Sequence, residues 1–425
     1  MEKTEFKDID ESLYSAVLPN GLKLCVVPKP GFSSFYAVFA TKYGGNHRCF
    51  ELDGRKIETP AGVAHFLEHK MFDMPNGDNA LNILAANGAD PNAFTASDMT
   101  AYYFQCTENF EENLRMLLRF VSTPYFTDET VEKEQGIIAQ EISMGDDNPG
   151  VRIYYNLLRL LYDHHPVRDK VAGTVESISE ITAQTLYDCH RAFYAPSNMC
   201  LCVEGDVDPE QILSIAEEVL PPEKRSVPLA DFGADEGELP AGNYRRESMQ
   251  VSAPQFLIGA KLRPAASGPD AMRQQLTGQL TMRMLVGLSS PFYMRLYAEG
   301  LLNRDFDYEV DCSYDTAAVI FGGESPEPER VLEEFNAEVK RAAEEGFDEE
   351  SFELAKRASL GARLRGLEDF DNVCVSTVCG VFSGYNIFDS MAMLEKLTKE
   401  DCEAFAAEKL AEDRLAISII DGGRV

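Results

Sequence analysis

The spacing of apolar residues along the chain predicts both strands and amphipathic helices. Residues 13–30 predict a hairpin, because two apolar runs flank Asn20-Gly21, a dipeptide typical of tight turns. Further strands are expected at residues 35–43, 99–106 and 198–204. Helices are expected at residues 61–74, 78–87, 108–122, 128–144, 150–162, 178–193 and 208–219. Strands interleaved with helices favour a layered α+β fold, with helices packed on one face of a sheet.

The second half of the chain repeats features of the first half. Residues 126–141 and 347–362 each begin with Phe and an acidic cap and continue into a helix, at an offset of 221 residues. Residues 192–206 and 406–422 each pass from a helix through a turn into an apolar strand that ends near Gly. An internal duplication with a period near 220 residues explains the similarity within both pairs of segments.

A segment rich in Pro and Gly separates the two halves. Residues 221–243 contain four Pro and three Gly and show no sustained hydrophobic period. We therefore expect an N-terminal half at 1–225, a linker at 226–243 and a C-terminal half at 244–425.

The amino-acid composition and net charge of the chain limit the kinds of molecule that it is expected to bind. The 425 residues include 39 Lys and Arg against 71 Asp and Glu, a formal net charge of −32. A surface this acidic repels phosphate backbones and anionic lipids, so we expect neither nucleic acid nor a membrane as a partner. The ten cysteines form no CxxC pair, and no apolar leader or run of the roughly 18 residues that span a bilayer is visible. These features favour a cytoplasmic protein.

The strongest chemical signal is His65-Phe66-Leu67-Glu68-His69. On a helix, His65 and His69 lie on one face and can offer imidazole nitrogens to one metal ion, with Glu68 on the same side. This HxxEH order is the inverzincin signature. Because hydrolytic zinc usually takes three protein ligands and one water, a third ligand must come from elsewhere.

Two glutamates on a later predicted helix are candidates for that ligand. Glu134 and Glu141 are seven residues apart and project from one face, two turns distant. Glu141 lies between apolar neighbours and is the better candidate ligand, whereas Glu134 is expected to support the site or face the substrate. At the 221-residue offset these positions become Ala355 and Ala362, and residues 244–425 contain no HxxEH. Only the first half therefore carries the metal chemistry.

These motifs resemble those of the pitrilysin/insulinase family of zinc metallopeptidases, which includes the mitochondrial processing peptidase. The family pattern is HxxEH followed some seventy residues later by a Glu, and here 71 residues lie between His69 and Glu141. The likeness is greater still to bacterial members that occur as pairs, one with and one without the zinc motif, and that are associated by name with elongation factor P modification. It rests on AHFLEHKMF, NAFTASDMTAYYF, PYFTDETVEKEQGIIAQEI, HPVRDKVAGTVESI and FYAPSNM.

The resemblance implies an α+β fold of two homologous α/β-roll halves, of the LuxS/metallohydrolase-like type. Each half would have a mainly antiparallel sheet with helices on one face. The resemblance also implies roles for matching residues. Zinc would bind His65, His69 and Glu141, Glu68 would be the catalytic base, and Glu134 would support catalysis. Substrate peptide would add as a strand along Asn92, Ala93 and Phe94, and Tyr308 would contact it from the second half.

One departure from the family pattern affects the expected activity. Tyr297 stands where active relatives carry an Arg that grips substrate carbonyls. We therefore expect a homodimer, or a heterodimer with a homologous subunit that lacks the zinc motif. The predicted function is a zinc-dependent endopeptidase acting on short unfolded peptides. The alternative is a zinc-binding scaffold or maturation subunit that needs a homologous partner and has little peptidase activity of its own.

Two other groups of residues could bind a metal by type, but their sequence context indicates structural roles. His164-His165-Pro166 is interpreted as a loop before a Pro rather than a second metal site. Cys200 and Cys202 share one face of a predicted strand and are interpreted as buried strand residues.

Overall fold

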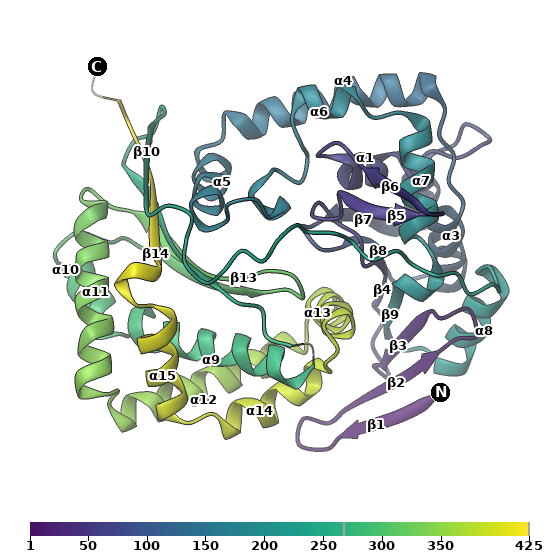
Figure 1. Ribbon diagram of the computed structural model, residues 1–425. Helices are drawn as coiled ribbons and strands as arrows, with labels where there is room; N and C mark the ends of the chain where they lie inside the picture. The colour runs from purple at the N-terminus through teal and green to yellow at the C-terminus, as the bar shows by residue number, and fades with distance from the viewer. Residues whose placement is uncertain (267, 424–425) are drawn as a thin grey trace. The chain divides into compact units, whose positions relative to one another are not determined.

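Two mixed sheets organise the chain in the computed structural model, which describes residues 1–266 and 268–423 (Figure 1). The contacts within the chain define two compact units, each assembled from three stretches of sequence. Unit 1 consists of Met1–Ile142, Asp169–Phe232 and Leu364–Phe382. Unit 2 consists of Ser143–Arg168, Gly233–Arg363 and the chain from Ser383 onward.

The sheet of unit 1 has seven strands in the order β1-β2-β3-β9-β4-β8-β7. In that order the strands are Glu2–Phe6, Glu11–Val17, Lys23–Pro28, Met199–Gly205, Phe35–Thr41, Thr100–Cys106 and Ala89–Thr95. Among the described strands of this sheet, only β3 and β9 pair in parallel, and β7 is an edge strand that pairs with β8 alone. A separate hairpin consists of β5 (Cys49–Leu52) and β6 (Arg55–Glu58).

Alternation along the central strand β9 separates two different layers of side chains. Met199, Leu201 and Val203 belong to an apolar core shared with the helices of unit 1. Those helices are α1 (Val63–Lys70), α2 (Ala80–Ala86), α3 (Phe110–Ser122), α4 (Asp128–Asp146), α6 (Val175–Ser179), α7 (Ala183–Phe193) and α8 (Pro209–Val219). Cys202 and Glu204 face the other way, as strand geometry requires, and meet Cys374 on α13 (Phe370–Ser383). Both cysteines of β9 are buried, as predicted.

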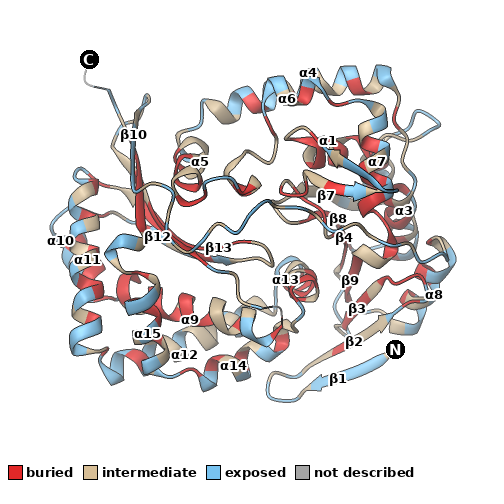
Figure 2. Ribbon diagram, in the orientation of Figure 1, coloured by how far each residue is buried: buried red, intermediate tan, exposed pale blue. Residues whose placement is uncertain are grey.

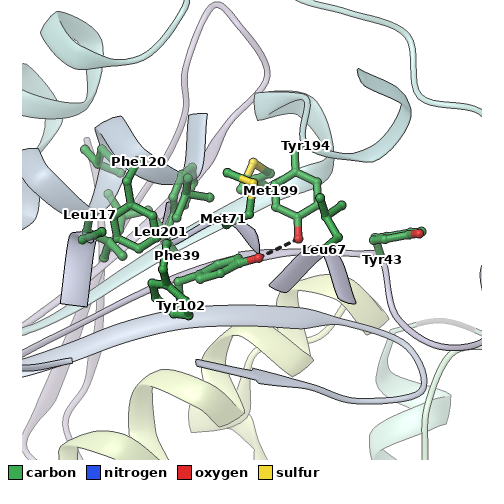
Figure 3. Close-up of a cluster of buried hydrophobic side chains, with 14 of the residues drawn as sticks. Phe39, Tyr43, Leu67, Met71, Tyr102, Leu117, Phe120, Tyr194, Met199 and Leu201 are labelled. Carbon is green, nitrogen blue, oxygen red and sulfur yellow. Dashed lines mark hydrogen bonds between the residues drawn. The ribbon is translucent and has the colours of Figure 1, made fainter. Parts of the chain in front are cut away.

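The core of unit 1 contains one buried polar contact between aromatic residues. Figure 3 shows the hydroxyl groups of Tyr102 and Tyr194 hydrogen bonded at 2.8 Å among Phe39, Leu67 and Leu201. Burial in this environment raises the pKa of both phenols, so each stays protonated. The contact gives the buried hydroxyl of Tyr102 a hydrogen-bond partner, while Tyr194 also interacts with Thr100.

The sheet of unit 2 repeats the topology of unit 1. Its order is β10-β14-β11-β13-β12, which corresponds to β3-β9-β4-β8-β7. The strands are Tyr244–Ser248, Leu415–Asp421, Gln255–Leu262, Ala317–Glu324 and Asp307–Cys312. In both sheets the first pair is parallel and the remaining pairs are antiparallel. The predicted α+β fold of two homologous halves is confirmed.

Helices of the second half cover one face of this sheet. They are α9 (Pro269–Val286), α10 (Pro291–Ala298), α11 (Pro328–Glu345), α12 (Glu349–Gly366), α14 (Ser390–Lys396) and α15 (Lys399–Lys409). Short 3₁₀ turns lie at Pro166–Arg168, Pro196–Asn198, Ile387–Asp389 and Glu412–Arg414. The burial pattern in Figure 2 follows this arrangement, because the central strands and the inward helix faces are buried, whereas the outer strands β1 and β10 are mostly exposed.

The opposite face of each sheet is covered by a helix from the other half of the sequence. Helix α5 (Pro149–Leu161) packs in unit 2, where Leu157 and Leu161 join Ile320 and Ala416 in an apolar cluster. The approach is close, since a Cβ on Gly259 of β11 would lie 3.0 Å from Leu157 and 3.1 Å from Leu161. Helix α13 covers the corresponding face in unit 1. The two helices start 370 − 149 = 221 residues apart, so equivalent helices are exchanged between the units.

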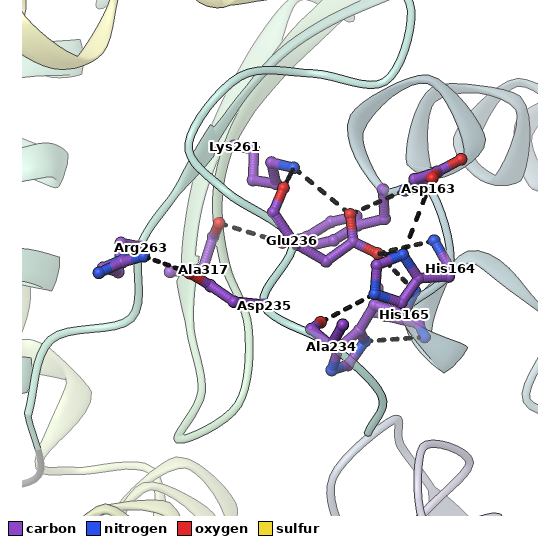
Figure 4. Close-up of polar contacts among 11 residues, drawn as sticks. Asp163, His164, His165, Ala234, Asp235, Glu236, Lys261, Arg263 and Ala317 are labelled. Atoms are coloured by element: carbon purple, nitrogen blue, oxygen red, sulfur yellow. Dashed lines mark hydrogen bonds and ion pairs between the residues drawn. The ribbon is translucent and has the colours of Figure 1, made fainter. Parts of the chain in front are cut away.

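The segment predicted as a linker forms specific contacts within each of the two units. Ala230 forms a bridge with Phe50 of β5. In unit 2, Glu236 accepts hydrogen bonds of 2.8, 2.7 and 2.6 Å from the backbone N–H groups of residues 163–165, beyond the end of α5 (Figure 4). Burial alone would raise the pKa of Glu236, but these donors and the Lys261 ammonium lower it to about 2. His164 and His165 thus lie in a loop, as predicted.

The compact units do not follow the predicted division of the chain at the linker. The boundaries 1–225, 226–243 and 244–425 remain a prediction about the duplicated halves, since α5 and α13 each lie in the unit built mainly from the other half. Within the described residues, no helix combines the length and apolar composition needed to cross a bilayer.

Candidate metal centre

Helix α1 presents both histidines of the HxxEH motif on one face. The helix begins after Gly62, whose φ of 98° and close approach to the backbone of Ala172 leave no room for a side chain. Phe66 and Leu67 are buried and anchor the opposite face in the core. The rings of His65 and His69 lie with their centroids 4.6 Å apart.

Helix α4 brings Glu141 to these two rings. Its buried residues Val131, Ile138 and Ile142 fix the rotation of the helix. Oε1 of Glu141 lies 3.5 Å from Nε2 of His65, and Oε2 lies 3.7 Å from Nε2 of His69. The hydrogen bond with His65 lowers the pKa of Glu141, which favours a carboxylate.

The three side chains fit a zinc ion. One ligand atom from each of His65, His69 and Glu141 lies within 4.8 Å of the other two, and among the described residues this is the group of side chains with the spacing to hold a metal ion. Ligands at about 2.0–2.2 Å in a tetrahedron lie roughly 3.3 Å apart, close to the two separations above. Two imidazoles and one carboxylate also form a donor set found in catalytic zinc sites with an open fourth position.

Glu134 orients one of the histidines. Oε1 of Glu134 lies 3.0 Å from Nδ1 of His69, which leaves Nε2 directed toward Glu141. Burial alone would raise the pKa of Glu134, but the contact with His69 lowers it. Burial likewise opposes the charge on His69, yet the hydrogen bond to Glu134 and the nearby carboxylates raise its pKa. Such carboxylate–histidine contacts fix the ring and its tautomer at metal sites.

Lys70 was not identified from the sequence, although it follows His69 directly. Its side chain is only 1% exposed, and Nζ pairs with Asp73 and lies 4.0 Å from Oε2 of Glu134. The buried ammonium therefore supports the carboxylate that orients His69.

Glu68 is held by the hydroxyl of a residue in the predicted substrate strand, although the sequence assigned that hydroxyl no role. Oγ1 of Thr95, at the end of β7, donates a 2.5 Å hydrogen bond to Oε2 of Glu68. Glu68 is buried. The sequence feature that points to Thr95 is its position directly after Asn92, Ala93 and Phe94, which are the predicted substrate contacts.

The remaining candidate residues lie on edge strands or on a helix surface. Asn92, Ala93 and Phe94 lie on β7, one of the two edge strands of the unit 1 sheet. Tyr308 lies on β12, one of the two edge strands of the unit 2 sheet, where burial raises its pKa. Tyr297 lies on α10 with its ring stacked on Tyr293 at a centroid distance of 5.7 Å.

Comparisons with known sequences agree with this arrangement. The profile of insulinase, peptidase family M16, matches residues 54–175, which include the whole histidine and glutamate cluster. A second profile, described as the peptidase M16 inactive domain, matches residues 180–359.

Individual relatives extend over the full chain. A protein of Bacillus subtilis named as an uncharacterized zinc protease, YmfH, is 38% identical over 422 residues, covering 97% of each chain. The crystal structure of a protein from Alicyclobacillus acidocaldarius, described as M16-like peptidase, has a TM-score of 0.93 at 35% identity, covering 99% of this chain and 100% of that one. A protease from Helicobacter pylori shares the fold, with a TM-score of 0.84 at 18% identity, covering 96% of this chain and 99% of that one.

Proposed function

Because the chain belongs to the insulinase family of peptidases, family M16, we propose that it is a zinc-dependent endopeptidase acting on short unfolded peptides. The observation that carries the proposal is the convergence of His65, His69 and Glu141, with Glu68 next to them on α1. The zinc protease name of the Bacillus subtilis relative supports the choice of metal. The inactive-domain profile on residues 180–359 agrees with chemistry confined to the first half.

The proposed roles follow from the positions of the side chains. A bound zinc ion would lower the pKa of a water molecule and polarise the scissile carbonyl. Glu68 would accept a proton from that water and later donate it to the leaving amine. Thr95 occupies Oε2 of Glu68, which leaves Oε1 for this proton transfer. Glu134 would keep Nε2 of His69 directed at the metal through its contact with Nδ1.

Substrate binding is proposed along the edge strand β7. Its backbone pairs with β8 on one side only within the described sheet, so an extended peptide can add on the other side. Main-chain hydrogen bonds made by Asn92, Ala93 and Phe94 would hold the peptide with little regard to sequence. Thr95 ends the same strand, which links this edge to Glu68.

A second candidate function is a zinc-binding scaffold or maturation subunit with little activity of its own. The feature that favours it is Tyr297, which stands where the family resemblance leads us to expect a substrate-gripping Arg. We propose that a second copy or a homologous subunit without the zinc motif pairs with this chain and supplies the missing contact. A cytoplasmic location remains a prediction from composition.

Peptide turnover distinguishes the two functions. Purified protein loaded with one equivalent of zinc is incubated with a mixed peptide library, and cleavage is followed by mass spectrometry. If the chain is an endopeptidase, it cleaves peptides from the library and Glu68→Gln abolishes this cleavage. A parallel sample contains the chain mixed with its homologous partner. Cleavage that appears only with the partner would favour the subunit function, and no cleavage in either sample would refute the endopeptidase.

A further inference from the structure

Unit 2 contains a cavity of about 730 Å³ that the zinc chemistry does not use. One wall is the first half of α5, including Tyr154 and Tyr155, and the other is formed by β11, β12 and β13. Leu257 and Ile320 provide an apolar floor. The volume lies within the range of about 300–1,000 Å³ that is typical of ligand pockets.

Four carboxylates line this cavity, and none of the described lining residues is basic. They are Asp305, Asp307, Glu309 and Glu324. Asp307 and Glu309 are two residues apart on β12 and therefore share a face, while the intervening Tyr308 packs against the core on the opposite face. Asp307 and Glu309 are exposed. Within the described residues, none of the four carboxylates forms an ion pair with a basic side chain.

The few polar contacts of these carboxylates leave most of their acceptor capacity open. Asp307 accepts a 2.8 Å hydrogen bond from the backbone N–H of Tyr308. Asn303 donates to Glu324 at 3.1 Å and to Asp305 at 3.4 Å. Each ionised carboxylate can accept about four hydrogen bonds, so several positions remain for a donor that enters the cavity.

The net field in the cavity favours a cation. The amino-terminal turn of α5 also faces the cavity through Gly150 and Val151. A helix terminus contributes roughly half a positive charge, far less than the four negative charges nearby. The aromatic and aliphatic walls suit the methylene stem of a long side chain, whose charged end then meets the carboxylates.

We propose that this cavity binds a Lys or Arg side chain of an extended peptide, and so selects cationic peptides for the chain. The inference rests on the proposed peptidase function for the identity of the ligand as a substrate. The argument combines an open cavity, apolar walls for the stem and four carboxylates without basic partners. It assigns substrate preference to four carboxylates from the half of the sequence that lacks the zinc motif.

The experiment measures peptide binding without turnover. Fluorescence anisotropy follows labelled peptides with the full chain carrying Glu68→Gln and one zinc ion. Two probe peptides of identical length differ only at one central position, Lys or Gln. The test variant adds Asp307→Asn and Glu309→Gln. The matched control adds Glu350→Gln and Glu353→Gln, which change the net charge equally at exposed positions of α12.

The proposal predicts a loss of affinity of about tenfold for the Lys peptide in the test variant at low salt, equivalent to about 1.4 kcal/mol. Affinity for the Gln peptide should stay within twofold, and the control should keep both affinities. The difference should shrink at 0.5 M salt, because the Debye length falls. Equal losses in test and control variants, or equal losses for both peptides, would overturn the proposal.

Failure of the inference can be separated from failure of the proposed function. Library cleavage by the zinc-loaded wild type, with peptide binding that ignores Asp307 and Glu309, refutes the cavity assignment alone. Selective binding of the Lys peptide without any cleavage keeps the cavity assignment and refutes the endopeptidase. Circular dichroism melts of both double variants verify that each one is folded.

Discussion

The hydroxyl of Thr95 donates a 2.5 Å hydrogen bond to Oε2 of Glu68, across 27 residues of sequence. The contact joins the end of the edge strand proposed to bind substrate with the residue proposed as general base. It therefore couples the placement of the peptide backbone to the placement of the proton acceptor. This relationship gives the most direct test of how the site is organised.

Thr95→Val should lower kcat by about 10–100-fold, because the branched side chain keeps its shape but no longer fixes Glu68. Zinc content should stay at one per chain, since Thr95 touches none of the candidate ligands. Thr95→Ser, which retains the hydroxyl, is the matched control and should keep most of the activity. Steady-state kinetics and metal analysis of both variants check this, and equal activity in Val and Ser variants would contradict it.

The proposed ligand set predicts one zinc per chain. Glu141→Gln should reduce zinc content clearly, because a neutral amide is a weaker ligand than a carboxylate. Glu68→Gln should retain the metal while losing hydrolysis, since Glu68 is not proposed as a ligand. Plasma mass spectrometry after gel filtration measures the stoichiometry. Unchanged zinc in Glu141→Gln would remove Glu141 from the set.

Glu236 predicts an acid-sensitive attachment of the linker segment. Its pKa of about 2 lies below the ordinary value of 4.5, so its contribution to stability is present above pH 4.5 and is lost as the pH falls toward 2. Glu236→Gln should lower the free energy of unfolding by about 2 kcal/mol at pH 7, as expected for charge-assisted hydrogen bonds. Urea unfolding at pH 7 and pH 3 measures this. A cost of equal size at both values would contradict it.

The contribution of Glu204 to the free energy of unfolding should depend on pH in the opposite direction to that of Glu236. Its side chain is fully buried, 3.4 Å from Nζ of Lys29, and burial raises its pKa to about 8 despite that lysine. Its contribution is therefore fully present below pH 4.5 and is lost as the pH rises through 8. Glu204→Gln should raise stability at pH 9 by up to about 4 kcal/mol, because the wild-type carboxylate must ionise there in a buried site whereas glutamine stays neutral, and Lys29 keeps Glu11 as a partner. At pH 5 the variant and wild type should unfold at similar denaturant concentrations.

The sequence predicted most elements because their hydrophobic periods were long. The hairpin at residues 13–30 and the strands that became β4, β8 and β9 are confirmed. The helix expected at 178–193 is two helices, since Thr182 caps α7 by accepting a hydrogen bond from the N–H of Thr185. The helix expected at 61–74 ends at Lys70, because Asp73 forms a bridge with Asn79.

Other features depend on contacts that no local pattern encodes. The HxxEH spacing indicated that His65 and His69 share a helix face, and the seven-residue spacing indicated a shared face for Glu134 and Glu141. The partners of Glu68 and Glu134, by contrast, are set by tertiary packing. The apolar stripe of α5 predicted burial, but a stripe does not specify which sheet the helix will cover.

The exchange of α5 and α13 has a consequence for synthesis on the ribosome. The strand β9 is complete at residue 205, whereas the helix that covers its second face begins at residue 370. During synthesis, Cys202 and Glu204 on the second face of β9 therefore stay uncovered until α13 has emerged from the ribosome. For the same reason, separate genes encoding the two halves would yield fragments that each lack the helix that covers their sheet in the intact chain. A single chain thus supplies both halves, and with them α5 and α13, in equal amounts.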